Sequence, residues 1–317
     1  MIVLLLATAA DAPRPAWWAQ LSAWTYQSCR AFLRHNTVAH ATRAAANGAP
    51  LRLLKLGSCW GGFDCANPSY YAPAHFRAFR DFMRAAEAGT LGMVTGSPRA
   101  DGRADDTAPA AAPTAAPTLR GAEATLAWDS LLEGTYSVLR DAACPASGLV
   151  PNWFVPTQAA ALAEADAARA RAQWPGWAPG RASCSGSGTP ATEFGAEASR
   201  TVWRVALDAL WYGAPAAQSF CRAVAASATP RLLARNASAT ASAGGATGDA
   251  PPGCPGLVEG VADGWLSRGY MLGPLAAALL VPPAGAPDTA GRQQAALDVA
   301  AAALDALRVD ELSLIHI

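Results

Sequence analysis

The sequence predicts an all-α protein whose helices are joined by long loops, on three observations. Apolar residues make up 52% of the 317-residue chain and charged residues only 15%, which suits a well-buried helical core. Apolar side chains recur three and four residues apart in several segments, the spacing of an amphipathic helix. No segment alternates convincingly as a strand, and no repeat has a fixed period. Many antiparallel helices joined in this way suggest an α/α toroid.

Three helices are expected in the first half of the chain. From Pro15 to Leu33 the apolar residues lie on or near one face. A second helix is expected to start at Pro73, because proline presets φ at a first helical position. The third runs from Ala122 to Arg140. Between the first two, Asn47–Pro50 is predicted to be a loop, followed by a short apolar run from Leu51 to Leu56.

Three more helices are expected in the second half. The clearest follows Gly195 in the segment Phe194–Gly213, and the others span Gly264–Leu280 and Gln293–Leu307. Three segments without an apolar period are predicted to be disordered insertions or flexible loops: 96–117, 180–192 and 238–256.

Charge and composition argue against several kinds of partner. Lys+Arg and Asp+Glu are each 24, so nothing points to nucleic acid or to an anionic membrane surface. The apolar run at residues 1–10 is too short to span a bilayer and has no basic region before it. No glycine-rich phosphate loop follows a strand, which argues against nucleotide binding.

Cysteine and tryptophan usage adds two expectations. Seven cysteines occur without a Cys-x-x-Cys motif or a His-rich cluster, so no metal or cofactor is expected. Cys59 and Cys65 are close enough in sequence to close a small disulfide loop if the protein is exported. The eleven Trp residues suit a carbohydrate site, because flat indole rings pack against the apolar faces of sugars, although core packing is the commoner role of a single Trp.

Two segments carry the residues best suited to a site. In Phe194–Gly213, Glu197 stands at the start of a helix, where the helix dipole favours an anion, and Arg200 and Trp203 follow. In Gly57–Arg77, a loop punctuated by Gly and Pro carries four candidate residues: Trp60, Asn67, Tyr70 and Tyr71. Loops on a rigid helical scaffold commonly carry function, whereas the alternative for the two tyrosines is simple packing.

Both segments resemble the signatures of glycoside hydrolase family 8, the inverting endo-glucanases, chitosanases and xylanases. The family pattern Gly-Tyr-Asp-Ala-x-Arg-x-Pro-Trp-Arg aligns without gaps to Gly195–Arg204, with Ala196 in place of Tyr and Glu197 in place of Asp. The pattern Asn-Pro-Ser-Tyr-Phe-Ala-Pro-Ala-Tyr-Tyr-Arg resembles the end of the second segment, and Gly-Leu-Val-Pro-Asp-Trp resembles Gly148–Trp153. The resemblance implies an (α/α)6 barrel.

The resemblance implies a role for each candidate in hydrolysis of a β-1,4-linked polysaccharide. Glu197 would be the general base, Tyr70 would help to hold the attacking water, and Arg200 would keep the carboxylate ionised. The implied substrate-binding residues are Trp60, Asn67, Tyr71, Trp153 and Trp203. No cofactor or metal is implied, and we expect a secreted monomer that binds no nucleic acid and no membrane.

The resemblance also implies that the chain is a fragment of a longer protein. The family's catalytic acid and a sugar-binding Asp would precede Met1, so we expect one domain over residues 1–311, truncated at both ends and inactive alone. Residues 312–317 resemble a translated sequencing adapter. Two alternatives stay open: a non-catalytic glycan-binding or scaffold protein on the same fold, which Ala196 and Glu197 favour, and a helical structural protein whose Trp residues only pack.

Overall fold

The structure is a computed structural model, and it describes residues 15–57, 65–89, 121–145, 147–156, 177–179, 194–238, 269–284 and 287–305. Within these ranges the chain forms seven α-helices, one short 3-10 helix and two two-stranded sheets, so the mainly helical prediction is confirmed. The three predicted flexible segments lie outside the described residues, apart from Ser238. The N-terminal apolar run, the adapter-like C-terminus and Trp60 also lie outside them.

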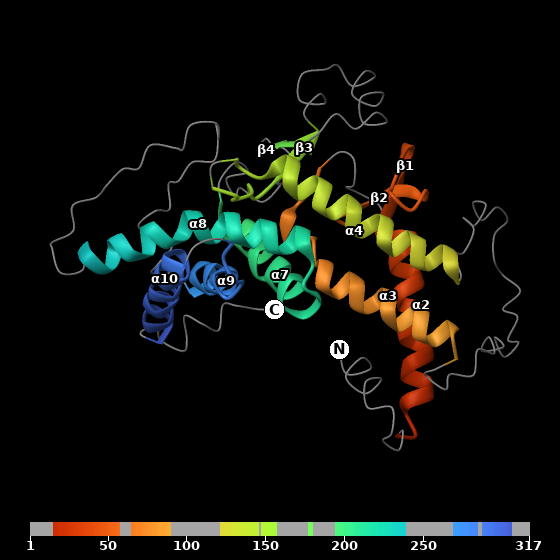
Figure 1. Ribbon diagram of the computed structural model, residues 1–317. Coiled ribbons are helices and arrows are strands. Elements are labelled where there is room, and N and C mark those ends of the chain that lie inside the picture. Colours follow the sequence, from red (N-terminus) through yellow and green to blue (C-terminus); the bar gives the residue numbers. More distant parts are fainter. Residues whose placement is uncertain are drawn as a thin grey trace, which may run out of the picture.

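All six predicted helices are present, with somewhat different ends: α2 (Trp18–His35), α3 (Pro73–Glu87), α4 (Ala122–Ala142), α7 (Ala196–Tyr212), α9 (Gly269–Leu279) and α10 (Pro287–Asp305). The last of these begins at Pro287, earlier than predicted, in keeping with the preference of proline for a first helical turn. In Figure 1, α7 lies between the α2–α3–α4 side of the molecule and the α8–α9–α10 side. None of the described helices combines the length and the apolar character that a membrane span requires.

Helix α8 (Pro215–Ser238) is not predicted from the sequence, and it packs against α7, α9 and α10. Its buried stripe contains small side chains, Ala217, Ala225 and Ala228, beside Phe220 and Val224. Further alanines lie on its exposed face, so the contrast between the two faces is weak in the sequence. A stripe of this kind buries a helix without the large apolar side chains that reveal a period of 3.6.

The expectation of no strands is wrong at two places. Strands β1 (Thr37–Ala44) and β2 (Pro50–Leu54) form an antiparallel hairpin whose turn coincides with the predicted loop. Strand β3 (Phe154–Pro156) pairs with β4 (Trp177–Pro179). In β2, Leu51 and Leu53 are buried and the residue between them is half-buried, an alternation too short to stand out from an apolar run.

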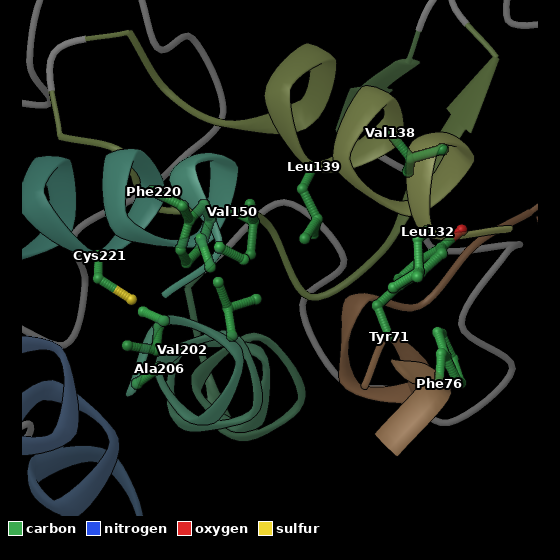
Figure 2. Close-up of a cluster of buried hydrophobic side chains, with 14 of the residues drawn as sticks. Tyr71, Phe76, Leu132, Val138, Leu139, Val150, Val202, Ala206, Phe220 and Cys221 are labelled. Atoms are coloured by element: carbon green, nitrogen blue, oxygen red, sulfur yellow. The ribbon is translucent and has the colours of Figure 1, made fainter. Parts of the chain in front are cut away.

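One hydrophobic cluster includes residues from all seven described helices. Figure 2 shows part of it, where Val202 of α7 and Phe220 of α8 lie on facing helices. At another point Trp128 of α4 is fully buried, and three rings pack around it at centroid distances of 5.6, 6.1 and 5.7 Å: Phe32, Phe76 and Phe79. Packing is therefore the role of this Trp.

Gly134 marks a close contact between α4 and the hairpin. A Cβ built on it would lie 1.9 Å from the carbonyl oxygen of Arg52 in β2, so a side chain fits only if the helix or the strand moves. We expect Gly134→Ala to lower the free energy of unfolding by about 1–3 kcal/mol, measured by urea denaturation.

Gly291→Ala in α10 is the matched control for Gly134→Ala. Nothing lies within 4 Å of the Cβ built on Gly291, and Ala is favoured over Gly inside a helix by up to about 1 kcal/mol. We therefore expect this control to be neutral or stabilising. Equal stability of the two variants would contradict the close packing at Gly134.

Two of the described cysteines are disulfide-bonded and two are free. Cys65 and Cys144 are disulfide-bonded, whereas Cys29 and Cys221 are buried free thiols. Burial raises the pKa of each free thiol to about 12, which makes both unreactive near neutral pH. The predicted pairing of Cys59 with Cys65 stays a prediction, because Cys59 lies outside the described residues.

Candidate active site

A short 3-10 helix, η1 (Pro68–Tyr70), packs against α7. Asn67 caps η1: its Oδ1 accepts a hydrogen bond from the backbone N–H of Ser69 at 2.8 Å. Pro68 at the first position has no N–H to satisfy, which suits the start of a helical turn. This local structure turns the side chains of Asn67 and Ser69 toward the first turn of α7.

Glu197, in the first turn of α7, receives both of these side chains. Its Oε2 accepts hydrogen bonds from Asn67 Nδ2 at 3.2 Å and from Ser69 Oγ at 2.9 Å. A third bond comes from the Arg200 guanidinium at 3.1 Å, which is also an ion pair. Ser69 Oγ lies 2.6 Å from Asn67 Oδ1 as well, so its single hydrogen serves one of the two acceptors at a time.

The three donors hold one oxygen of the carboxylate. Among the described residues, the hydrogen bonds of Glu197 all reach Oε2, which leaves Oε1 for a solvent molecule. Asn67 and Ser69 are buried, whereas the Glu197 side chain is 25% exposed and that of Arg200 is 46% exposed. The carboxylate therefore lies at the boundary between a buried polar cluster and solvent.

The first turn of α7 is capped by a residue from elsewhere in the chain. Gly195 at the N-cap position has no side chain to offer. Instead, Oδ1 of the buried Asn152 accepts hydrogen bonds from the backbone N–H groups of Gly195 and Ala198, both at 3.0 Å. This role of Asn152 is not predicted from the sequence, although glycine at the N-cap leaves the first N–H groups of α7 without a side-chain acceptor of their own.

Tyr70 adjoins one of the residues that hold Glu197. It follows Ser69, whose hydroxyl contacts Glu197, and it is 47% exposed. Burial lowers the pKa of the Arg204 guanidinium, Arg200 lowers it further, and Glu197 and Tyr70 raise it. Arg200, Glu197 and Tyr70 therefore each lie within electrostatic reach of Arg204.

The structure places three of the predicted substrate-binding residues inside the protein. Asn67 is 1% exposed and its amide contacts Ser69 and Glu197, so it holds the carboxylate. Tyr71 is 1% exposed, its ring stacks on Phe154 at 6.3 Å, and burial raises its pKa. Trp153 is 7% exposed and packs near Leu56 and Cys65. All three side chains are buried in this structure, and their contact with a sugar stays a prediction.

The structure describes one of the two remaining predicted substrate-binding residues, Trp203. Trp203 is half-buried, and the guanidinium of its neighbour Arg204 lies 5.6 Å from the centre of its ring. Trp60 lies outside the described residues. The contact of either ring with substrate stays a prediction.

Asp208, near the C-terminal end of α7, is a buried charge. Its side chain is fully buried and bonds two other helices: Arg77 Nε of α3 at 2.7 Å and the Tyr136 hydroxyl of α4 at 2.5 Å. Burial, followed by the nearby Asp208 charge, raises the pKa of Tyr136. This network joins α3, α4 and α7 and so supports the helix that carries Glu197.

Two aromatic side chains at the end of α7, Trp211 and Tyr212, are exposed. Trp211 is 51% exposed and lies 6.1 Å from the ring of His75, and Tyr212 is 39% exposed with Arg77 at 6.0 Å. Burial lowers the pKa of His75, and the charge of Arg204 lowers it further.

The described residues contain no group of three or more His, Cys, Asp or Glu side chains placed to share a metal ion.

Comparison with known proteins gives a partial match at low identity, although no protein-family model matches the chain. The chain is 26% identical over 176 residues to Endoglucanase 2 of Ruminiclostridium josui. It is 25% identical over 176 residues to Endoglucanase C of Ruminiclostridium cellulolyticum. Each match covers 54% of this chain but only 23% of the relative. The chain is therefore similar to a limited part of two proteins named endoglucanases.

Proposed function

We propose that the full-length parent of this chain is an endo-acting glycoside hydrolase that cleaves β-1,4-linked polysaccharide with inversion. The observation that carries the proposal is the Glu197 carboxylate, which has one oxygen held by three donors and the other left for water. The similarity to two endoglucanases supports the substrate class. We further propose a monomer with one family-8-like domain on an (α/α)6 toroid.

In the proposed reaction Glu197 removes a proton from the water that attacks the anomeric carbon. The three donors hold Oε2 in place, so Oε1 accepts the proton. The exposed phenol of Tyr70, beside Ser69, orients that water. The proposed proton transfer uses only these side chains and needs no cofactor.

Inversion also requires a second carboxyl that protonates the leaving oxygen, about 6.5–9.5 Å from the base. The described contacts of Glu197 are with an amide, a hydroxyl and a guanidinium, none of which supplies that acid. We propose, as the family resemblance implies, that the acid precedes Met1 in the parent protein. The chain alone is then expected to be inactive.

The disulfide-bonded cysteines support an extracellular protein. Disulfides persist in oxidising compartments such as the secretory pathway and the cell exterior. Cys65 lies next to Ala66 in the segment that leads to η1, and Cys144 follows α4 shortly before Asn152. Both therefore lie in segments that lead to the proposed site.

The proposed function is tested by incubating the full-length parent with a soluble β-1,4-glucan. We expect reducing ends to be released together with a rapid fall in viscosity, because an endo-acting enzyme cuts within the chain. The 317-residue chain, assayed in parallel, is expected to release none. Absence of hydrolysis by the full-length parent would contradict the proposed hydrolase activity.

A non-catalytic glycan-binding protein is the second candidate. The observation that favours it is the hydrogen bonding of Glu197 to Asn67 and Ser69. These bonds join α7 to η1, and a residue with a purely structural role would make the same contacts. Ala196 in place of the family Tyr points the same way. Binding of β-1,4-gluco-oligosaccharides by the full-length parent without any turnover would select this alternative.

A further inference from the structure

We propose that Asn152 is a positioning residue for the Glu197 carboxylate, an inference that rests on the proposed function. Asn152 contacts neither the carboxylate oxygen Oε2 nor its three donors in the bonds described above. Its effect on the site passes through the backbone of α7 and through the segment that follows it. Three independent features of the structure support this role.

The first feature is where the cap attaches. Asn152 Oδ1 accepts hydrogen bonds from Gly195 and Ala198, which lie on either side of Glu197 in the sequence. One side-chain atom therefore fixes the backbone both before and after the candidate base. Because Glu197 is the second residue of α7, any fraying of the first turn would move its carboxylate directly.

The second feature is the bridge between Phe154 and Ala66. The N–H of Phe154 donates to the carbonyl of Ala66 at 3.0 Å, and the N–H of Ala66 donates to the carbonyl of Phe154 at 2.9 Å. Ala66 directly precedes Asn67, which donates to Glu197. Residues 152–154 thus contact both segments that meet at Glu197: Ala66, next to Asn67, through the backbone of Phe154, and α7 through the side chain of Asn152.

The third feature is a lack of space at Gly195. A Cβ built on this residue would lie 2.6 Å from Asn152 Nδ2 and 3.1 Å from Oδ1. The amide of Asn152 therefore occupies the volume that a side chain at position 195 would need. The buried amide at 152 therefore requires glycine at 195. A helix that is capped by the side chain of its own N-cap residue has no such requirement.

These features predict that removal of the Asn152 side chain lowers kcat more than it lowers the stability of the fold. Loss of a helix cap typically removes only part of the stability of a protein, so we expect Asn152→Ala to remain folded. A shift of about 1 Å in a catalytic group, in contrast, lowers the rate by as much as 10²-fold. We expect Asn152→Ala in the full-length parent to lower kcat by about 10–10²-fold with little change in KM. Asn152→Asp, which keeps an acceptor oxygen in place, should retain at least about a third of the wild-type kcat.

The experiment compares kcat, KM and thermal unfolding of the wild-type parent, Asn152→Ala and Asn152→Asp, with amide hydrogen exchange at Ala198 as a readout independent of activity. Asn47→Ala is the matched control, because Asn47 Oδ1 also accepts a backbone N–H, that of Ala49, but in the exposed hairpin turn. We expect faster exchange at Ala198 in Asn152→Ala only, and an unchanged kcat for the control.

Each outcome of this experiment decides the inference. Faster exchange at Ala198, a kcat defect in Asn152→Ala and rescue by aspartate support it. A folded Asn152→Ala variant with wild-type kcat overturns it while leaving the proposed function intact. If Asn152→Ala does not fold, Asn152→Asp decides: a folded aspartate variant with protected Ala198 and a kcat loss above about 10-fold overturns the inference. A wild-type parent without turnover overturns the proposed function and this inference together.

Discussion

Glu197→Gln is expected to lower kcat of the full-length parent on β-1,4-glucan by about 10²–10⁴-fold, the contribution usual for a general base. Glutamine keeps the size of the side chain, and its amide oxygen replaces Oε2 as the acceptor for Asn67 and Ser69. Its NH₂ group, in contrast, is unable to take a proton from water. KM should change little, because the geometry of the cluster is preserved.

The control for this variant is Glu123→Gln. Glu123 and Glu197 are both the second residue of their helices, α4 and α7, so the two substitutions remove the same charge from the same part of a helix dipole. Glu123 is exposed and far in sequence from the candidate site. Steady-state kinetics should show wild-type activity for Glu123→Gln. Equal activity of both variants would mean that Glu197 has only a structural role.

Asp208→Ala is expected to be the most destabilising of the substitutions considered, by about 3–5 kcal/mol, because it leaves a charge without its partner. The Asp208 carboxylate is fully buried between Arg77 and the Tyr136 hydroxyl. Arg77 is only 22% exposed, so water replaces the lost ion pair poorly. Urea denaturation of the purified protein measures the change.

The matched control is Asp129→Ala, which removes a carboxylate from a more exposed ion pair. Asp129 is 36% exposed and pairs with Arg80, which also contacts Asp81 and so keeps a partner. Surface pairs of this kind contribute about 0–1 kcal/mol. A loss for Asp208→Ala no larger than that for Asp129→Ala would show that the buried network contributes little to the fold.

How much of the fold the sequence predicts depends on the size of the buried side chains. Helix α4 is predicted almost to its ends, because large residues such as Trp128, Leu132 and Leu139 mark its buried face. Helix α8 is missed, because alanine occupies both its buried and its exposed faces. The hairpin is missed because only three residues of β2, Leu51 to Leu53, show the alternation of a strand.

The candidate site is predictable in its parts but not in its contacts. Residue patterns single out both Asn67 and Glu197, yet 130 positions separate them, and only the fold shows that an amide of one holds the carboxylate of the other. Tyr70 and Tyr71 are adjacent, and residue type alone does not predict which of the two is buried. In the structure Tyr70 ends the short helix and is exposed, whereas Tyr71 enters the core. Which of two adjacent tyrosines is buried depends on a backbone turn that composition does not determine.

Azide rescue of a Glu197→Ala variant of the full-length parent tests the role of this residue most directly. Azide is a nucleophile that needs no base to deprotonate it, so it replaces the water that Glu197 would activate. We predict that the variant hydrolyses no β-1,4-glucan, and that added azide restores cleavage and yields a glycosyl azide of the α configuration. Unimpaired hydrolysis without azide, or rescue that yields the β configuration, would contradict the assignment of Glu197 as the base of an inverting reaction.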